Sequence, residues 1–334
     1  MSQPASMSDA MNAIVITKFG GPEVLEFQTV AKPVPTVGEV TIQVKAFGLN
    51  HAEHHMRAGE WDVYNRISGL EAVGIVTACP GGELNVGDKV IAAMGGMGRE
   101  RPGSYGEYVN VPASNVAAVK TDLPWEVLAA LPEVYLVAWT CLFTILDLKK
   151  GERLLLRGAT STLGDAALKL AASAGAIVTA TTRTANRFAQ LCTAGATHTL
   201  LEHPNLASEL PSHCTFDKTL NLIGNSVLVE SIALTRPHGR MLQAGWLGGL
   251  TPLVGFNPML EMASGVHFSL FHSKTLGGPA FPLKDIPVQA IVDLVESGQI
   301  DASPKRVFRY RDIVAAHQML DSGVGGKLVV THEM

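Results

Sequence analysis

The chain has 334 residues, 47% of them hydrophobic and 17% charged, which is enough apolar material for the cores of about two domains. Its net charge of -4 and its lack of a basic block argue against nucleic acid as the main partner, because neutralising phosphates requires clustered Lys and Arg. The four cysteines are scattered, and no apolar leader or apolar run of about 20 residues occurs, so we expect a reduced, cytoplasmic protein without a membrane span.

The first third of the chain carries strand and turn signals. After a polar opening that predicts a disordered extension over residues 1–11, apolar or alternating runs at 13–16, 40–46 and 90–92 predict strands. Clusters of Gly and Pro, such as FGGPEVLEF, PGGELNVGD and MGGMGRERPGS, separate these runs and predict turns. Residues 12–132 are therefore expected to form a compact, mostly β domain.

A strand, a tight turn and a helix are predicted between Gly151 and Gly175. Residues 154–156 are continuously apolar, as in a strand covered on both faces, and the apolar residues of the following helix share one face. Gly164 permits a close approach of helix and strand. The unpaired N–H groups that begin such a helix are typical of a pyrophosphate site, which we assign to Gly158, Ala159, Thr160, Ser161, Thr162, Leu163 and Gly164.

One position departs from the usual dinucleotide fingerprint. Ser161 stands where the second glycine is expected, and Thr162 follows it. We expect these two hydroxyls to donate to phosphate oxygens in compensation.

The next strand ends in Thr181-Thr182-Arg183, where a site for NAD usually has an acid roughly 20 residues after the glycines. A 2′-phosphate can instead be bound by Arg183 and Arg187 through charge-assisted bonds and by the Thr182 hydroxyl. This pattern favours NADPH as the cofactor. The alternative is that the arginines are merely solvated at a strand end.

From about residue 133 the pattern alternates between helix and strand. Further strands are expected near 199, at 218–222 and at 240–244, which together predict a doubly wound parallel sheet. The tail predicts a helix over 288–298, a strand at 306–310, a helix near 313–320 and a strand at 327–330, and we expect it to pack onto the first domain. Residues 262–276 are a candidate mobile cover.

Several motifs, in order, resemble one family. They are FGGPEVL, AFGLNHAEHHMRAG, GLEAVGIV, NVGDKVIA, GSYGEYVNVP, LPEVYLVAWTCLF and GVGGKLVV. Together they resemble the medium-chain dehydrogenase/reductase superfamily, in its zinc-independent quinone reductase or zeta-crystallin-like branch. The resemblance implies an α/β fold with a GroES-like β domain (12–132 and 281–334) and a Rossmann NADPH-binding domain (133–280). It also implies a homodimer joined at the edges of the Rossmann sheets, for which the apolar strand at 241–244 is suitable.

The resemblance further implies roles for single residues. Asn50 would lie beside the nicotinamide and Lys327 would reach the cofactor from the tail. Tyr135, Val137 and Trp139 would come from the segment entering the cofactor domain. The residues that pass the nicotinamide ribose would be Leu222, Ile223, Gly224, Gly245 and Trp246.

No metal is expected. Zinc-dependent relatives have Cys and His where this chain has Asn50 and Leu70, and four distant cysteines cannot form a structural zinc site. His51 and His55 share a helical face in the cluster His51-Ala52-Glu53-His54-His55, but no third ligand in the manner of an HExxH site stands nearby in the sequence.

Without a Lewis acid, the developing negative charge must be spread over the substrate, which favours a quinone or an α,β-unsaturated carbonyl as acceptor. Asn50 would orient the nicotinamide or bind the enolate oxygen. Tyr64, Tyr135 and His55 are candidate proton donors, with solvent as an alternative. A flat apolar platform for the small-molecule acceptor is predicted from Trp61, Trp139, Trp246 and Phe271.

Other functions fit parts of the same pattern. A zinc-type alcohol dehydrogenase is the nearest enzymatic alternative. A trans-acting enoyl reductase of a biosynthetic assembly line, or a noncatalytic NADPH-binding partner of a larger complex, also remains open.

Overall fold

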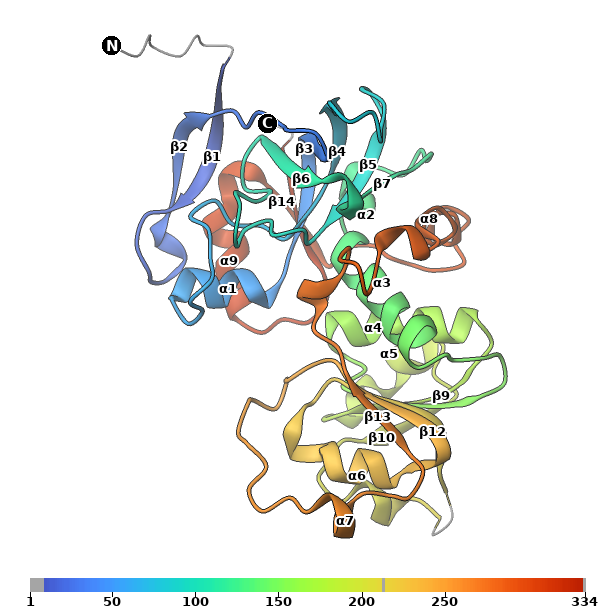
Figure 1. Ribbon diagram of the computed structural model, residues 1–334. Coiled ribbons are helices and arrows are strands. Elements are labelled where there is room, and N and C mark those ends of the chain that lie inside the picture. The colour runs from blue at the N-terminus through green and yellow to red at the C-terminus, as the bar shows by residue number, and fades with distance from the viewer. Residues whose placement is uncertain (1–8, 212–213, 333–334) are drawn as a thin grey trace. The chain divides into compact units, whose positions relative to one another are not determined.

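The computed structural model describes residues 9–211 and 214–332, and these divide into two compact units (Figure 1). Unit 1 contains residues up to Leu136 and those from Lys274 onward, and unit 2 contains Val137–Ser273. The predicted extension at 1–11 lies mostly outside the described residues. Its last two residues, Ala10 and Met11, begin the first strand.

Unit 1 is built mainly on antiparallel strand pairs, and one pair in its larger sheet is parallel. Strand β1 (Ala10–Ile16) pairs with β2 (Leu25–Ala31). A seven-stranded sheet has the order β14 (Arg306–Arg309), β15 (Leu328–Thr331), β3 (Glu39–Leu49), β4 (Glu71–Ala78), β5 (Lys89–Ala93) and β7 (Val116–Ala118), with β6 (Tyr108–Pro112) also on β3. Leu328 lies opposite Leu49 in the antiparallel β15–β3 pair. The tail therefore joins the sheet of the first domain, as expected.

The helices of unit 1 follow local sequence rules. They are α1 (His51–Ala58), α2 (Trp125–Leu128), the start of α3 (Pro132–Trp139), α8 (Val288–Glu296) and α9 (Ile313–Asp321). Helix α1 starts where the Glu53 carboxylate accepts the Asn50 N–H at 2.8 Å, and it ends at Gly59 with φ 79°. The predicted apolar face of α8 is buried. The core includes Ile14, Ile42, Phe47, Val76 and Tyr105.

Unit 2 has a six-stranded sheet in which every paired strand is parallel. Its order is β10 (His198–Leu201), β9 (Ile177–Thr182), β8 (Arg153–Arg157), β11 (Phe216–Asn221), β12 (Thr235–Gln243) and β13 (His267–Leu270). Its helices are α4 (Thr162–Ser173), α5 (Phe188–Thr193), α6 (Leu228–Ala233) and α7 (Pro258–Glu261), and a π-helical turn at Thr140–Ile145 follows α3. In chain order of strands this is 3-2-1-4-5-6, the Rossmann arrangement, so the expected α/β fold class is confirmed.

Two expectations for unit 2 were wrong. The candidate cover at 262–276 contains β13, the sixth strand of the sheet, because the short sequence HFSL pairs with β12 although its apolar content is low. Strand β12 is consequently internal, so residues 241–243 are not at the edge of the sheet. The two edge strands are β10 and β13.

Among the helices of the described residues, none combines the length and apolar composition needed to cross a bilayer.

Candidate functional site

The turn after β8 forms a narrow cradle in unit 2. Gly158 has φ 84°, a conformation that favours glycine. A Cβ atom on Gly164 would stand 2.3 Å from the carbonyl oxygen of Gly158, so only glycine lets α4 approach this turn so closely. The structure thus supports the role expected for Gly164.

Ser161 has a different local role from the one expected. Its hydroxyl accepts the Gly164 N–H at 3.0 Å and donates to the Gly158 carbonyl at 2.9 Å, so it caps α4 and closes the turn. The expected donation from Ser161 to a phosphate conflicts with this geometry. Thr160 and Thr162 are half-buried, and within the described residues neither hydroxyl has a hydrogen-bond partner. These two hydroxyls remain available.

Cationic side chains follow β9. Arg183 is exposed and Arg187 is half-exposed, and neither forms an ion pair with any residue in the described ranges. Thr182 is only 3% exposed, so its hydroxyl does not lie on the surface with the arginines, contrary to expectation. The exposed hydroxyl at this strand end is that of Thr184, which sequence reasoning missed.

A buried ion network lies beneath the turn. Arg157, fully buried, donates to the carboxylates of Glu202 at 2.5 Å and Glu230 at 2.8 Å. Thr181 bridges this network to the turn, because its hydroxyl accepts the Gly158 N–H at 3.1 Å and donates to Glu202 at 2.5 Å. An acid does therefore lie near the turn, but Arg157 neutralises it. The only sequence signal was a charged residue at the end of an apolar strand.

Two further loops meet at the carboxyl ends of the sheet. The Asn221 side chain accepts the N–H groups of Ile223 at 2.9 Å and Gly224 at 3.0 Å, which holds the loop after β11. A Cβ on Gly245 would stand 2.6 Å from the Leu222 carbonyl, so the loop after β12 packs tightly against it. Because β8 and β11 are neighbours where the strand order reverses, these loops and the Gly158 turn border the place where such sheets bind ligands.

A polar triad of Asn50, Glu71 and Lys327 lies in unit 1. The Lys327 ammonium donates to Asn50 Oδ1 at 2.8 Å and forms an ion pair with Glu71. Asn50 Nδ2 donates to Glu71 Oε1 at 3.0 Å. Glu71 is fully buried, and its second oxygen accepts the Glu133 N–H at 2.7 Å. The structure thus brings together Asn50 and Lys327, both predicted, through Glu71, for which no role was predicted.

Two more carboxyls surround this triad. Glu53 is fully buried and accepts the N–H groups of Asn50 at 2.8 Å and Leu70 at 3.1 Å. Burial raises the pKa of Glu53 to about 7, more than the attraction of Lys327 lowers it. Burial also raises the pKa of Glu133 to about 7. Because Glu71 already pairs with Lys327, the other two carboxyls, Glu53 and Glu133, carry the free-energy cost of desolvation.

The candidate proton donors have distinct environments in unit 1. His55 stacks on Trp61, with ring centres 5.2 Å apart, and its Nδ1 lies 2.5 Å from a Glu60 carboxylate oxygen. Tyr64 packs edge-on against Phe19. Tyr135 is 3% exposed within α3, which makes it the least accessible of the three candidates.

The predicted aromatic platform divides between the units. Trp61 belongs to unit 1, whereas Trp139, Trp246 and Phe271 belong to unit 2. Trp139 packs on Phe143 with ring centres 4.3 Å apart, and Trp246 is 41% exposed. Phe271 is buried at 3% exposure, so it offers little surface for a ligand. The platform as a whole stays a prediction.

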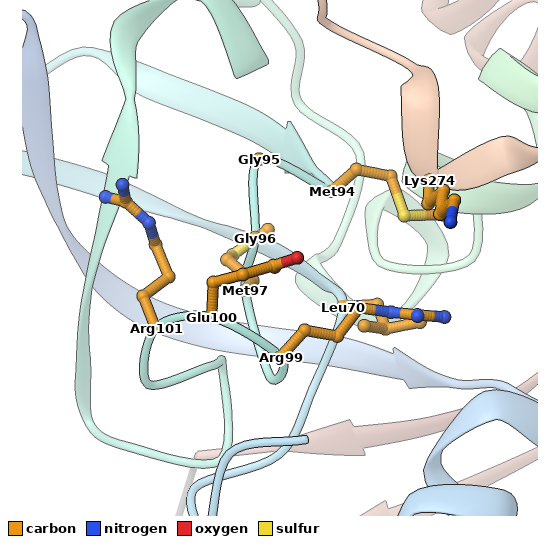
Figure 2. Close-up of a pocket in the computed structure, with 9 residues that line it drawn as sticks. All are labelled: Leu70, Met94, Gly95, Gly96, Met97, Arg99, Glu100, Arg101 and Lys274. Atoms are coloured by element: carbon orange, nitrogen blue, oxygen red, sulfur yellow. The ribbon is translucent and has the colours of Figure 1, made fainter. Parts of the chain in front are cut away.

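A pocket of about 310 Å³ opens in unit 1 (Figure 2). Its apolar lining comes from Leu70, Met94 and Met97, and its charged lining is Arg99, Glu100, Arg101 and Lys274. Most of it comes from the loop MGGMGRERPGS, in which Met94 and three glycines have positive φ. The sequence indicated only a turn there, because glycine-rich loops reveal their conformation but not what they enclose.

The residues do not fit zinc at the positions that zinc-dependent relatives use. The Leu70 side chain has no donor atom, and the Asn50 amide is bonded to Glu71 and Lys327. The predicted pair of His51 and His55 is not the group that the structure assembles. Among the described residues, His54, His55 and Glu60 have potential ligand atoms within 4.8 Å of one another.

That histidine group is poorly suited to a cation. Arg57 Nη2 lies 3.3 Å from His54 Nδ1, so its guanidinium charge opposes a metal ion there. The same His54 nitrogen lies 2.7 Å from an Asp321 oxygen. Holding an ion through Nδ1 would break both contacts.

Comparison with known families gives two matches. Residues 36–121 match the alcohol dehydrogenase GroES-like domain, and residues 162–281 match the family described as zinc-binding dehydrogenase. The first lies within unit 1, and most of the second lies in unit 2.

Curated relatives agree with these matches. The chain is 28% identical over 251 residues to the synaptic vesicle membrane protein VAT-1 homolog of Rattus norvegicus, covering 72% of this chain and 61% of that protein. It is 32% identical over 169 residues to the quinone oxidoreductase of Lama guanicoe, covering 48% and 49%. It is 28% identical over 309 residues to the highly reducing polyketide synthase phiA of a fungal species (strain ATCC 74256), covering 87% of this chain and 11% of the synthase. The chain thus matches less than two thirds of the length of each relative.

Solved structures share the fold over nearly the whole chain. AibC has a TM-score of 0.84 at 22% identity, covering 99% of both chains. The quinone oxidoreductase of Pseudomonas syringae pv. Tomato has a TM-score of 0.80 at 24% identity, and a mycobacterial protein solved with NADPH has 0.79 at 24% identity, each covering 96% of this chain and 99% of the other. With both domain families matched in order and the Rossmann strand order in unit 2, the chain belongs to the medium-chain dehydrogenase/reductase superfamily.

Proposed function

We propose that this chain is an NADPH-dependent reductase of conjugated carbonyl compounds or quinones, and that it works without a metal. The observation that carries the proposal is the Asn50, Glu71 and Lys327 triad, with Leu70 beside it lining the pocket of unit 1. Asn50, a hydrogen-bond donor, stands at one of the two positions where zinc-dependent relatives have a metal ligand, and Leu70, which has no donor atom, stands at the other. The residues present offer hydrogen bonds instead of a Lewis acid.

The cofactor assignment is supported by the cradle in unit 2. The Gly158 turn, closed by Gly164, leaves the amino end of α4 open for a pyrophosphate. Arg183 and Arg187 are cations without ion pairs within the described residues, and a 2′-phosphate would supply the missing negative charge. Bound NADPH would supply the hydride, while the protein positions the reactants. Ribose contacts are assigned to Leu222, Ile223, Gly224, Gly245 and Trp246, and a further contact to Lys327.

The protein groups of unit 1 would stabilise the acceptor. Asn50 Nδ2 donates one N–H to Glu71 and retains a second, which can bind the nicotinamide amide or the enolate oxygen. Lys327 donates to Asn50 and Glu71, so its ammonium fixes the orientation of the Asn50 amide. The proton that completes the reduction would come from His55, Tyr64, Tyr135 or water.

The same proposal includes a cytoplasmic homodimer acting on a small molecule. Because β12 is internal, the edge available for pairing two Rossmann sheets on that side is β13, where Phe268 and Leu270 are exposed. Sedimentation of the wild type and of a Phe268→Lys variant tests this. A dimer that survives the substitution unchanged would place the interface elsewhere.

The test of the activity is a panel of quinones, enones, alkenals and simple ketones, with oxidation of NADPH and NADH followed at 340 nm. We expect turnover of the conjugated acceptors, a lower KM for NADPH and no change after dialysis against a chelator. Exclusive reduction of simple ketones, or loss of activity with removal of stoichiometric zinc, would contradict the proposal.

A second candidate is the reduction of an enoyl thioester presented by a carrier protein. The match to the polyketide synthase phiA, which covers 87% of this chain, favours it. Adding a crotonyl thioester to the same panel, free and on a carrier protein, distinguishes the two. Turnover of the carrier-bound substrate alone would favour the second candidate.

A further inference from the structure

We propose that the pocket of unit 1 binds an anionic group of the acceptor through Arg99, so that the preferred substrate is a conjugated carbonyl compound that carries a carboxylate. This inference rests on the proposed function for the identity of the reacting group. The pocket and its charges are independent of that function.

Arg99 is a cation in the pocket wall. Its guanidinium carbon lies 4.4 Å from the centre of the Trp61 ring, a cation–π contact. Its Nε is buried without a hydrogen-bond partner, and within the described residues the side chain forms no ion pair. Burial lowers the pKa of Arg99, against the attraction of Glu100 and Glu53, which raises it. A ligand carboxylate would supply both the charge and the acceptors.

The second arginine of the pocket is different. Arg101 Nη1 lies 2.8 Å from Glu39 Oε1, and the pKa of Glu39 is lowered by the hydrogen bond from the Thr36 N–H and by this contact. Figure 2 shows the Arg101 side chain extending to one side of the pocket, with Arg99 and Lys274 extending to the other. Arg101 is thus neutralised and serves as an internal control.

The remaining charges leave a positive balance. Arg99 and Lys274 face one acid, Glu100, which is exposed. Glu53 also attracts Arg99, but its oxygens accept N–H groups from Asn50 and Leu70 and its pKa is raised to about 7 by burial. Two cations against one exposed acid favour an anion over a neutral ligand.

The form of the pocket favours a carboxylate over a phosphate ester. A volume of about 310 Å³ is at the small end for ligand pockets, and Leu70, Met94 and Met97 suit a short carbon chain. A planar carboxylate matches the guanidinium fork of Arg99. Leu70, which lines the pocket, is followed directly by Glu71 of the triad. The site proposed for the carboxylate and the site proposed for the conjugated carbonyl therefore both belong to unit 1.

The experiment uses two acceptors with the same conjugated ketone, 6-oxohept-4-enoate and its uncharged methyl ester. The readout is the ratio of kcat/KM for the acid to that for the ester. We expect the wild-type ratio to exceed 1, and Arg99→Met to lower it about tenfold to hundredfold, the loss typical of a hydrogen-bonded charge pair. Arg99→Lys should give an intermediate ratio because it keeps the charge and loses the fork. Arg101→Met is the matched control and should change the ratio by less than about threefold.

A binding measurement separates the pocket assignment from the proposed reductase function. Titration calorimetry with 6-oxoheptanoate, the saturated product, needs neither cofactor nor turnover. Arg99→Met should bind this acid more weakly than the wild type does, while both proteins should bind its methyl ester equally. If acid and ester are both inert but this loss is seen, the proposed function fails and the pocket assignment stands. Equal turnover and equal binding of acid and ester overturn the inference and leave the reductase proposal intact. Stronger competition by inorganic phosphate than by acetate also overturns it, in favour of a phosphate ligand.

Discussion

The exposed arginines after β9 offer a direct test of cofactor choice. Replacing Arg183 by Glu puts a negative charge beside the expected 2′-phosphate, which itself carries about two negative charges. In water, two unit charges about 4 Å apart interact by roughly 1 kcal/mol, so removing the Arg183 charge costs about 1–2 kcal/mol, and reversing it costs about twice that before screening by salt. Since 1.4 kcal/mol is tenfold, we expect KM for NADPH to rise roughly 30-fold to 100-fold at moderate salt.

NADH provides the internal comparison, because it lacks the 2′-phosphate. Its KM should stay constant or fall in Arg183→Glu, since a carboxylate at this place can accept hydrogen bonds from the ribose hydroxyls. The assay is steady-state kinetics with both cofactors at two ionic strengths, and the NADPH effect should shrink at high salt. Lys150→Gln is the control, because Lys150 is an exposed cation just before β8, at the opposite end of the strands from Gly158. Equal changes for both cofactors would remove Arg183 from the site.

Three further outcomes follow from buried contacts. Burial and Arg57 lower the pKa of His317 to about 3 from its usual 6.5. The free energy of unfolding should therefore fall by up to about 1.4 kcal/mol per pH unit as the pH falls from 6.5 toward 3. Urea titrations at several pH values should show a flatter pH dependence for His317→Gln, and equal slopes for both proteins would contradict this. Lys327→Met leaves Glu71 buried and uncompensated, which should cost about 3–5 kcal/mol of unfolding free energy, and Lys327→Met/Glu71→Gln should recover part of it; an unchanged melting temperature in the single variant would refute this. Gly164→Ala places a Cβ 2.3 Å from a carbonyl oxygen, so we expect a lower melting temperature and a KM for NADPH raised more than kcat is lowered, and wild-type values of both would be the contrary result.

Elements were predictable from the sequence where apolar residues recur at a regular spacing or where a turn residue marks the end of the element. Residues 154–156 formed a buried parallel strand, and the helix after them has its apolar residues on one face up to the turn at Gly175. The tail was placed correctly on the first domain. By contrast, β13 was missed, because its four residues include two polar ones and its pairing with β12 is decided by tertiary packing.

Two members of the triad in unit 1 were singled out from the sequence, but the connection between them was not. Asn50 and Lys327 were each assigned from motifs, yet the buried Glu71 that joins them looked like an ordinary charged residue at a strand start. The same holds for Arg157, whose partners Glu202 and Glu230 are 45 and 73 residues away. Contacts between distant segments depend on how strands are ordered in space, which a local pattern does not encode.

The antiparallel pairing of β15 with β3 has a consequence for biosynthesis. Leu328 meets Leu49 only after the ribosome has made everything between them, including all of unit 2. The inserted Rossmann unit is continuous in sequence and can acquire its structure first, while the strands on either side of it wait for their missing neighbour. A nascent chain arrested before residue 328 should therefore resist protease in its middle and be cleaved in its opening segment, the reverse of the usual order in which translation completes domains.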